Sequence, residues 1–180
     1  EKKKCYHSNL HDILKFYNIT NESNLTEQLS NSELNKYECS MKVQYINFCT
    51  KSIMHSKKLE FYQKLKVNYD PEPYLDIISN FSQRRNLTKL RISNHNLSIE
   101  SGRYNKIERD NRFCLLCPSN VIETEEHMIL NCSLYNNLRF RFEKKIKHYT
   151  NDSLTSETIY DLLSTNNSDM IMYLAIFISK

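Results

Sequence analysis

Apolar residues recur every three or four positions along most of the chain, a spacing that predicts amphipathic helices. The expected helical segments are 8–17, 31–54, 59–65, 74–78, 81–92, 134–149, 157–163 and 169–178. In the second of these, the apolar stripe expected to be buried consists of Leu34, Tyr37, Met41, Tyr45, Phe48 and Met54. By contrast, segment 97–100 alternates apolar and polar residues, which predicts a short strand. The strand is expected to end at Ser101-Gly102, where glycine permits a positive φ.

Three consecutive parts are expected from this pattern. They are a helical segment (1–80), a basic helix with a cysteine-rich insert and a following helix (81–150), and short C-terminal helices (151–180). The chain starts at Glu1 without an initiator Met and stops at Lys180 inside an apolar helical pattern, so we expect a fragment of a longer protein. No stretch approaches the roughly 18 apolar residues of a membrane-spanning helix, so no membrane partner is expected.

The composition excludes several classes of function. Only one of the 180 residues is glycine, whereas phosphate-binding loops, dinucleotide fingerprints and the nucleophile elbows of hydrolases need several glycines. The chain is 39% apolar, which is enough to bury a core at this length. Its net charge of +4 is modest and gains meaning only from its distribution.

The most specific chemical signal is the pattern C-x2-C-x9-H-x4-C, formed by Cys114, Cys117, His127 and Cys132. Two residues between cysteines allow a tight turn to direct both sulfurs at one ion, and a histidine and a third cysteine complete a tetrahedron. The sequence therefore predicts a structural zinc site. Four protein ligands leave no position for a catalytic water.

The spacing of the last two ligands constrains the backbone. Residues five apart in an ideal α-helix lie about 140° from each other around the axis. His127 and Cys132 can reach one ion only if the helix that starts in the acidic segment 123–126 ends near Asn131. Asn131 is of a residue type that tolerates the left-handed conformation often found at helix ends.

The other cysteines are less informative. A second site from Cys39, Cys49 and His55 is conceivable, but their spacings favour separate core positions. Cys5, His7 and His11 could share one end of a helix, but such a group more often reflects ordinary packing. A redox role for the C-x2-C motif would need a βαβ context, which the pattern does not predict.

Segments 87–95, 99–104, 113–117 and 123–135 together resemble the region that follows the polymerase domain in LINE-type (non-LTR) retrotransposon proteins. The resemblance implies that Cys114, Cys117, His127 and Cys132 are zinc ligands and that a polymerase domain precedes this region in the parent chain. The chain itself contains no polymerase or endonuclease motif, so we expect no enzymatic activity from it.

Positive charge brackets the cysteine cluster. Eight basic and three acidic residues lie between Arg84 and Arg112, and five basic residues and one acidic residue lie between Arg139 and His148. Such a field favours phosphate binding, although charged runs on amphipathic helices are often solvated faces. The candidate nucleic-acid contacts are Arg84, Arg85, Lys89, Arg91, Arg103, Arg109 and Arg112. Candidate base-stacking residues are Tyr104, Phe113, Phe140 and His148, unless they belong to the core.

These observations predict a mainly α protein: a helical domain with a small CCHC zinc-binding insert and one short β-hairpin. The expected function is a non-catalytic module that assists an intracellular, nuclear reverse transcriptase-like parent in holding RNA or DNA. The alternative is a docking module that contacts the polymerase domain or another protein without touching nucleic acid.

Overall fold

The computed structural model describes residues 15–16, 30–66, 70–150 and 154–180. These described residues are mainly helical and contain no strand. The chain divides into two compact units, Glu1–His55 and Ser56–Lys180, where the sequence suggested boundaries near 80 and 150. No helix within the described ranges has both the length and the apolar content needed to span a membrane.

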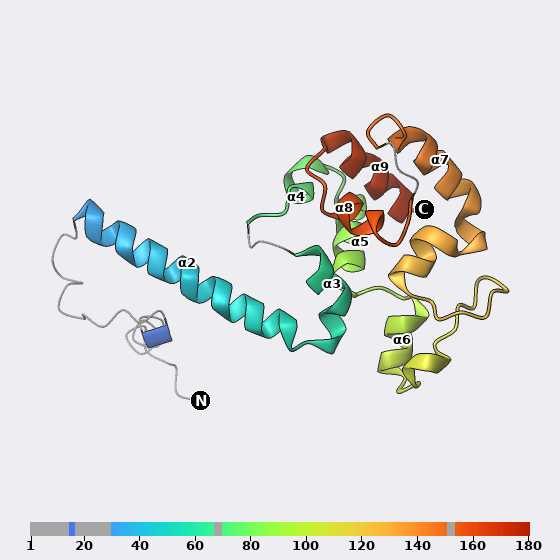
Figure 1. Cartoon of the computed structure of the whole chain (residues 1–180), viewed down its shortest axis with the longest axis horizontal. Helices are drawn as coiled ribbons and strands as arrows, with labels where there is room; N and C mark the ends of the chain where they lie inside the picture. Colours follow the sequence, from blue (N-terminus) through green and yellow to red (C-terminus); the bar gives the residue numbers. More distant parts are fainter. Residues whose placement is uncertain (1–14, 17–29, 67–69, 151–153) are drawn as a thin grey trace. The chain divides into compact units, whose positions relative to one another are not determined.

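In the first unit, helix α2 (Asn31–Met54) has the bounds that the sequence predicted (Figure 1). The predicted burial of its apolar stripe is wrong: Leu34, Tyr45 and Phe48 are each about half exposed (49%, 52% and 55%). Val43 and Ile46 are exposed as well, so apolar side chains are spread around this helix. Phe48 does meet Phe16 edge-on, with ring centroids 5.7 Å apart. Apart from residues 15–16, the predicted helix 8–17 lies outside the described residues.

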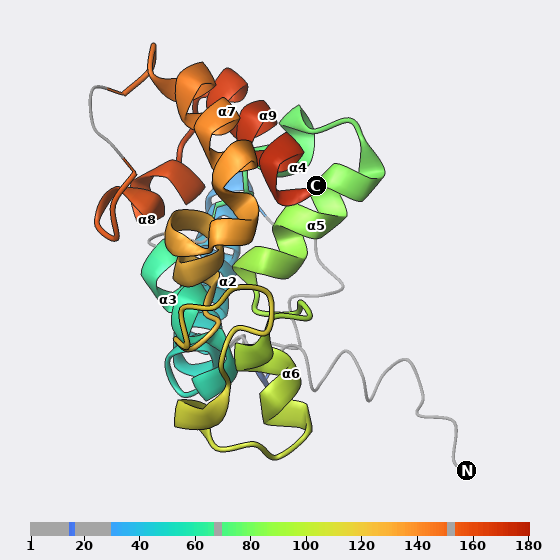
Figure 2. The same ribbon diagram turned by 90° about the vertical axis from the view of Figure 1, so that its right-hand side faces the viewer.

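The second unit is a cluster of short helices in which α9 packs against α4, α5 and α7 (Figures 1 and 2). Its helices and turns are η2 (Lys57–Leu59), α3 (Glu60–Leu65), α4 (Tyr74–Ile77), α5 (Phe81–Arg91), α6 (Ser98–Tyr104), η3 (Arg109–Asn111), η4 (His127–Asn131), η5 (Ser133–Tyr135), α7 (Asn136–Ile146), α8 (Thr158–Leu163) and α9 (Ser168–Ile178). The predictions for 74–78, 81–92, 157–163 and 169–178 are confirmed to within one residue at each end.

Side-chain caps explain where the two helices α5 and α9 begin. The Asn80 side chain accepts a hydrogen bond from the backbone N–H of Gln83, and the Asn167 side chain accepts one from Met170. Each cap satisfies an N–H group that the first turn of a helix leaves without a partner. A core of aliphatic and aromatic side chains then joins the helices. Its most deeply buried members include Ile78, Leu87, Ile129, Ile159, Leu174 and Ala175.

The strand predicted at 97–100 is wrong, because helix α6 begins there. The carboxylate of Glu123 accepts hydrogen bonds from the Ser98 backbone N–H (2.6 Å) and from its hydroxyl group (2.7 Å). The backbone of Glu123 accepts a third bond, from the Ile99 N–H (3.2 Å). A residue 25 positions away thus caps the helix, which no local apolar-polar pattern can reveal.

The single glycine also has a role different from the predicted one. Gly102 lies inside α6 without a positive φ. A Cβ atom at this position would lie 2.6 Å from the Cγ of Arg112, whose side chain crosses the helix here. Glycine is therefore needed for close packing rather than for a turn.

The predicted β-hairpin is wrong for the described residues, which contain no strand; they hold one isolated antiparallel bridge, between Phe113 and Ile122. Two backbone hydrogen bonds flank it, from the Cys114 N–H to Val121 (2.8 Å) and from the Glu123 N–H to Arg112 (2.9 Å). This short ladder holds the base of the loop that carries the C-x2-C motif.

Candidate metal centre

The structure brings Cys114, Cys117, His127 and Cys132 together. Each offers one ligand atom, and the four atoms all lie within 4.8 Å of one another. Cys114 and Cys117 lie in the loop between the bridged residues Phe113 and Ile122. His127 is the first residue of the turn η4, and Cys132 follows its last residue. Among the residues that the structure describes, this is the one cluster with the composition and spacing for a metal ion.

The separations of the ligand atoms suit a small tetrahedral ion. The sulfurs of Cys114 and Cys132 are 3.9 Å apart, and the sulfur of Cys117 lies 3.3 Å from Nε2 of His127. A tetrahedron with metal–sulfur bonds of about 2.3 Å and metal–nitrogen bonds of about 2.0 Å has edges of roughly 3.5 to 3.8 Å. Three of the four ligand residues are buried and Cys117 is partly exposed, so the cluster is closed on most sides.

A π-helical turn solves the spacing problem of the last two ligands. The Cys132 N–H bonds to the carbonyl oxygen of His127 at 2.8 Å, an i→i+5 hydrogen bond. This wider turn returns the chain to the same side after five residues, where an α-helix would have rotated past it. The prediction that the helix ends at Asn131 is confirmed. Asn131 does not adopt the left-handed conformation that its residue type tolerates, since its φ is not positive.

The C-x2-C loop gives its two cysteines different environments. The Cys117 sulfur lies 2.9 Å from the Ser119 hydroxyl group, and hydrogen bonding from Ser119 lowers the pKa of the Cys117 thiol to about 6. Burial raises the pKa of the Cys114 thiol to about 12. A positive φ of 52° at Asn120 reverses the chain after the motif.

Arg139 binds the backbone of the turn that carries His127 and Cys132, and it was not among the predicted site residues. Its guanidinium group is buried and donates to the carbonyl oxygens of Ile129 (2.6 Å), Cys132 (2.9 Å) and Met128 (3.4 Å). It thereby satisfies carbonyl groups at the end of the π-helical turn. Helical spacing contained a signal for this position, because Arg139 shares the buried face of α7 with Phe142 and Ile146.

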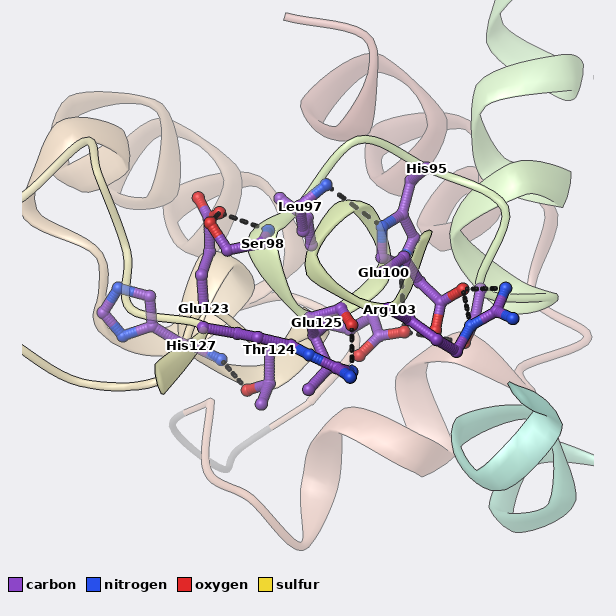
Figure 3. Close-up of polar contacts among 12 residues, drawn as sticks. His95, Leu97, Ser98, Glu100, Arg103, Glu123, Thr124, Glu125 and His127 are labelled. Carbon is purple, nitrogen blue, oxygen red and sulfur yellow. Dashed lines mark hydrogen bonds and ion pairs between the residues drawn. The ribbon is translucent and has the colours of Figure 1, made fainter. Parts of the chain in front are cut away.

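The acidic segment 123–126 before His127 forms hydrogen bonds with His127 itself and with the turn between α5 and α6 (Figure 3). The Thr124 hydroxyl group accepts the His127 backbone N–H at 3.0 Å. Glu125 is buried, and one of its carboxylate oxygens accepts from Ser93 (2.7 Å) and lies 2.9 Å from Nε2 of His95. Burial alone would raise the pKa of Glu125, but the hydrogen bonds and the charge of His95, together with Ser93, outweigh it and lower the pKa.

This Ser93, His95 and Glu125 group does not have the geometry of a nucleophilic triad. Both the serine and the histidine are bonded to the same carboxylate oxygen. In a triad the histidine lies between the hydroxyl group and the carboxylate and takes the proton from the hydroxyl group. The arrangement instead fixes the turn between α5 and α6, where Ser93 has a positive φ of 50°.

Of the predicted nucleic-acid contacts, Arg91 lies inside the protein, with 2% of its surface exposed. Its guanidinium group pairs with Glu72 at 2.6 Å, donates to the carbonyl oxygen of Leu163 and lies over the ring of Tyr74. We therefore exclude Arg91 from any interface.

Four other predicted arginines also have partners within the chain. Arg84 donates to the carbonyl oxygens of Leu75 and Ile78, and Arg112 donates to those of Ile107 and Ile99. The remaining two form ion pairs, Arg103 with Glu100 (2.9 Å) and Arg109 with Glu60 (2.8 Å).

Only Arg85 and Lys89 of the predicted set remain without such a contact in the described residues. They lie one turn apart on α5, where Arg85 is exposed and Lys89 is half-buried. The exposed aromatic rings in the predicted stacking set include Tyr104 (64%) and Phe140 (67%).

The structure forms no second metal cluster from Cys39, Cys49 and His55 within its described ranges. Both cysteines lie on α2, and His55 bonds to the carbonyl oxygen of Lys51. Cys5, His7 and His11 lie outside the described residues.

Comparison of the chain with protein-family models, with curated proteins and with solved structures finds no match in any of the three. The structure thus identifies a mainly helical protein with a Cys3His cluster that can hold a metal ion.

Proposed function

We propose that this chain is a zinc-stabilised helical module that binds nucleic acid and has no catalytic chemistry of its own. The convergence of Cys114, Cys117, His127 and Cys132 within 4.8 Å carries the proposal. Three sulfurs and one imidazole nitrogen are ligands that Zn²⁺ prefers, and four protein ligands are typical of a structural site.

The zinc ion would organise a segment that has little regular structure of its own. Residues 105–124 contain one 3₁₀ turn and one β-bridge among the described elements. Binding the ion joins this segment to η4, which packs against α7. Structural zinc sites convert metal affinity into folding free energy, on the order of 10 kcal/mol.

Exposed cations on two helices support nucleic-acid binding. Arg85 lies on α5, and Arg141, Lys144 and Lys147 are exposed along α7 and the residue after it. Both helices pack against α9, and the exposed ring of Phe140 lies within the same basic segment. The resemblance to LINE-type retrotransposon proteins favours the same function, with the parent polymerase as partner and the nucleus as the place of action.

The metal part of the proposal is tested by native mass spectrometry of the chain purified with zinc. We expect one zinc ion per chain and its loss in Cys132→Ser. Cys49→Ser is the matched control and should keep the ion, because Cys49 belongs to no cluster in the described residues. A wild-type chain without bound zinc under these conditions would overturn the proposal.

The nucleic-acid part is tested by fluorescence anisotropy with a labelled single-stranded RNA and a duplex DNA between 50 and 200 mM salt. Affinity should fall steeply with salt, and Lys144→Gln/Lys147→Gln should reduce the log–log slope by up to about 2, because each phosphate contact contributes about 0.9. A control double variant is Lys36→Gln/Lys51→Gln on α2. Equal slopes for all three proteins would contradict phosphate contact by α7.

A docking module is the second candidate, and one observation favours it. Five of the seven predicted nucleic-acid contacts are occupied within the chain, while Leu34, Tyr45 and Phe48 on α2 are exposed. Association through such apolar side chains depends little on salt, so salt-independent binding to a partner protein and no binding to RNA or DNA would favour docking.

A further inference from the structure

A groove of about 480 Å³ lies beside the C-x2-C loop and is lined by none of the four candidate ligands. It is lined by residues of α5, of the turn that leads into α6, and of the C-terminal end of α9. Its volume is within the range of about 300 to 1,000 Å³ that is usual for small-molecule sites.

The interior of the groove is apolar and its rim is unusually exposed. The buried side chains of Leu90, Met128 and Phe177 line it. The rim is formed by Leu115 and Leu116, which are 89% and 50% exposed. Because these two leucines lie between the ligands Cys114 and Cys117, binding of a metal by the cysteines would hold both at the rim.

Polar groups at the wall give the groove hydrogen-bonding capacity. Asn86, Asn96 and Ser101 are among the lining residues, so two side-chain amides and one hydroxyl group belong to residues of the wall. Each amide offers both a donor and an acceptor, so the groove can pair with a planar ligand that carries the same two kinds of group on its edge. An apolar peptide side chain would leave these groups without partners.

The accessible charge at the groove is positive. Lys89 and Lys180 both contribute to the lining. The carboxylate of Glu123 also lines the groove, but it is 4% exposed, one oxygen accepts two bonds from Ser98, and the other faces the Cys114 thiol at 3.5 Å. An anionic group on a ligand would therefore meet the lysines and not the glutamate.

We propose that this groove binds one unpaired nucleotide of a single-stranded nucleic acid, with the base between the leucine rim and the apolar interior and a phosphate at Lys89. The inference rests on the proposed function and assigns it a site and a strand preference. A base in a duplex is stacked and paired, so its faces cannot reach the groove, whereas an unpaired base can be splayed out and bound by its edge and faces.

The groove is tested directly by titrating the ¹⁵N-labelled, zinc-loaded chain with adenosine 5′-monophosphate and recording amide chemical shifts. Saturable shifts should be confined to the groove, around Asn96, Leu115 and Leu116. Separate titrations use inorganic phosphate and N-acetyl-leucinamide. The proposal would be overturned if the nucleotide did not shift the groove amides. This holds whether inorganic phosphate shifts them, the leucine derivative shifts them, or no probe does.

A second experiment compares binding to a single-stranded 12-mer and to its duplex. Leu115→Ser/Leu116→Ser should weaken single-strand binding about fivefold to tenfold, the scale of one lost base contact, and change duplex binding less than about twofold. Val121→Ser, exposed in the same loop but outside the groove, is the matched control. The zinc content of each variant is measured first, so that a lost ligand site is not mistaken for a lost groove.

The outcomes separate the two proposals. The groove proposal would be overturned if the wild-type chain bound both the single strand and the duplex while Leu115→Ser/Leu116→Ser weakened the two equally or neither. That result would leave the proposed function standing. Groove shifts with the nucleotide but no binding to the single strand or to the duplex would contradict both the wider function and the assignment of the groove to a single strand.

Discussion

The guanidinium group of Arg139 donates a hydrogen bond to the carbonyl oxygen of Cys132, the last of the four candidate ligands, at 2.9 Å. The same group donates to the carbonyl oxygen of Ile129 at 2.6 Å, inside the π-helical turn that separates His127 from Cys132. A residue of α7 thus fixes the backbone that presents two ligands. Partners of this kind commonly change metal affinity by about 10- to 100-fold.

We therefore expect Arg139→Lys to weaken zinc binding by at least about tenfold, because lysine cannot span several carbonyl groups with one planar fork. Competition with a chromophoric chelator measures the affinity. Arg141→Lys is the control, since Arg141 lies on the same helix but is exposed. Equal affinities of the two variants, with unchanged helical circular dichroism, would show that Arg139 does not position the ligands.

Zinc binding should strengthen as pH rises. The Cys114 thiol, with its pKa raised to about 12 by burial, is protonated at pH 7.5 and must release that proton to become a ligand. The Cys117 thiol, with a pKa of about 6 owing to Ser119, is mostly a thiolate there and takes up its proton as pH falls through about 6. Calorimetry in two buffers of different ionisation enthalpy counts the protons released.

The variant Ser119→Ala provides the internal test of this explanation. Without the hydroxyl group, the pKa of Cys117 should rise toward its ordinary value of 9.0, so zinc binding at pH 7.5 should release up to about one further proton. Ser133→Ala, exposed next to Cys132, should release the same number as wild type. An unchanged proton count in Ser119→Ala would contradict the assigned role of the serine.

The Arg91–Glu72 pair should be important for stability. Arg91→Ala leaves the Leu163 carbonyl group unpaired and leaves Glu72 with Lys66 as its ion-pair partner, so we expect a loss of about 2 to 4 kcal/mol in the free energy of unfolding. Urea denaturation monitored by circular dichroism measures it. Arg85→Ala, exposed on the same helix, should change stability by less than about 0.5 kcal/mol. Similar midpoints for both variants would refute the structural role of Arg91.

Glu125 should contribute a pH-dependent part of the stability. Its pKa is lowered in the folded protein from 4.5, so its contribution is complete above that value and is lost as pH falls through the lowered folded pKa. Glu125→Gln should therefore be less stable by roughly 2 kcal/mol at pH 7, and the difference should shrink below pH 4.5. Glu108→Gln, on the surface, is the control. A difference that persists unchanged into acid would contradict the ionised state of Glu125.

Most helices of Ser56–Lys180 could be predicted because their apolar residues face one core. The bounds of α5 and α9 follow from the periodicity of Leu87 and Leu90, and of Ile171 and Leu174, together with the caps Asn80 and Asn167. The four candidate ligands were also evident, because their spacing depends on local turns. These features are set by neighbours in the sequence.

What could not be predicted depends on contacts between distant segments. The Glu123 carboxylate accepts the Ser98 N–H, so a helix begins where the alternating pattern predicted a strand. The ion pair with Glu72 stabilises Arg91 in the interior. Charge counts treated Arg91 and Arg139 as surface residues, although both are buried beside carbonyl groups. A cation that satisfies several acceptors inside the fold looks the same in a sequence as one that faces solvent.

The π-helical turn between His127 and Cys132 has a consequence for variation at this site. Removing or adding one residue within 128–131 would convert the i→i+5 geometry into another repeat and rotate one ligand away from the others. Substitutions in this stretch can be tolerated where packing allows, but length cannot change. In other chains with a C-x2-C motif followed by a histidine and a cysteine, four residues between these last two ligands would therefore be a better mark of a working site than the identity of those residues.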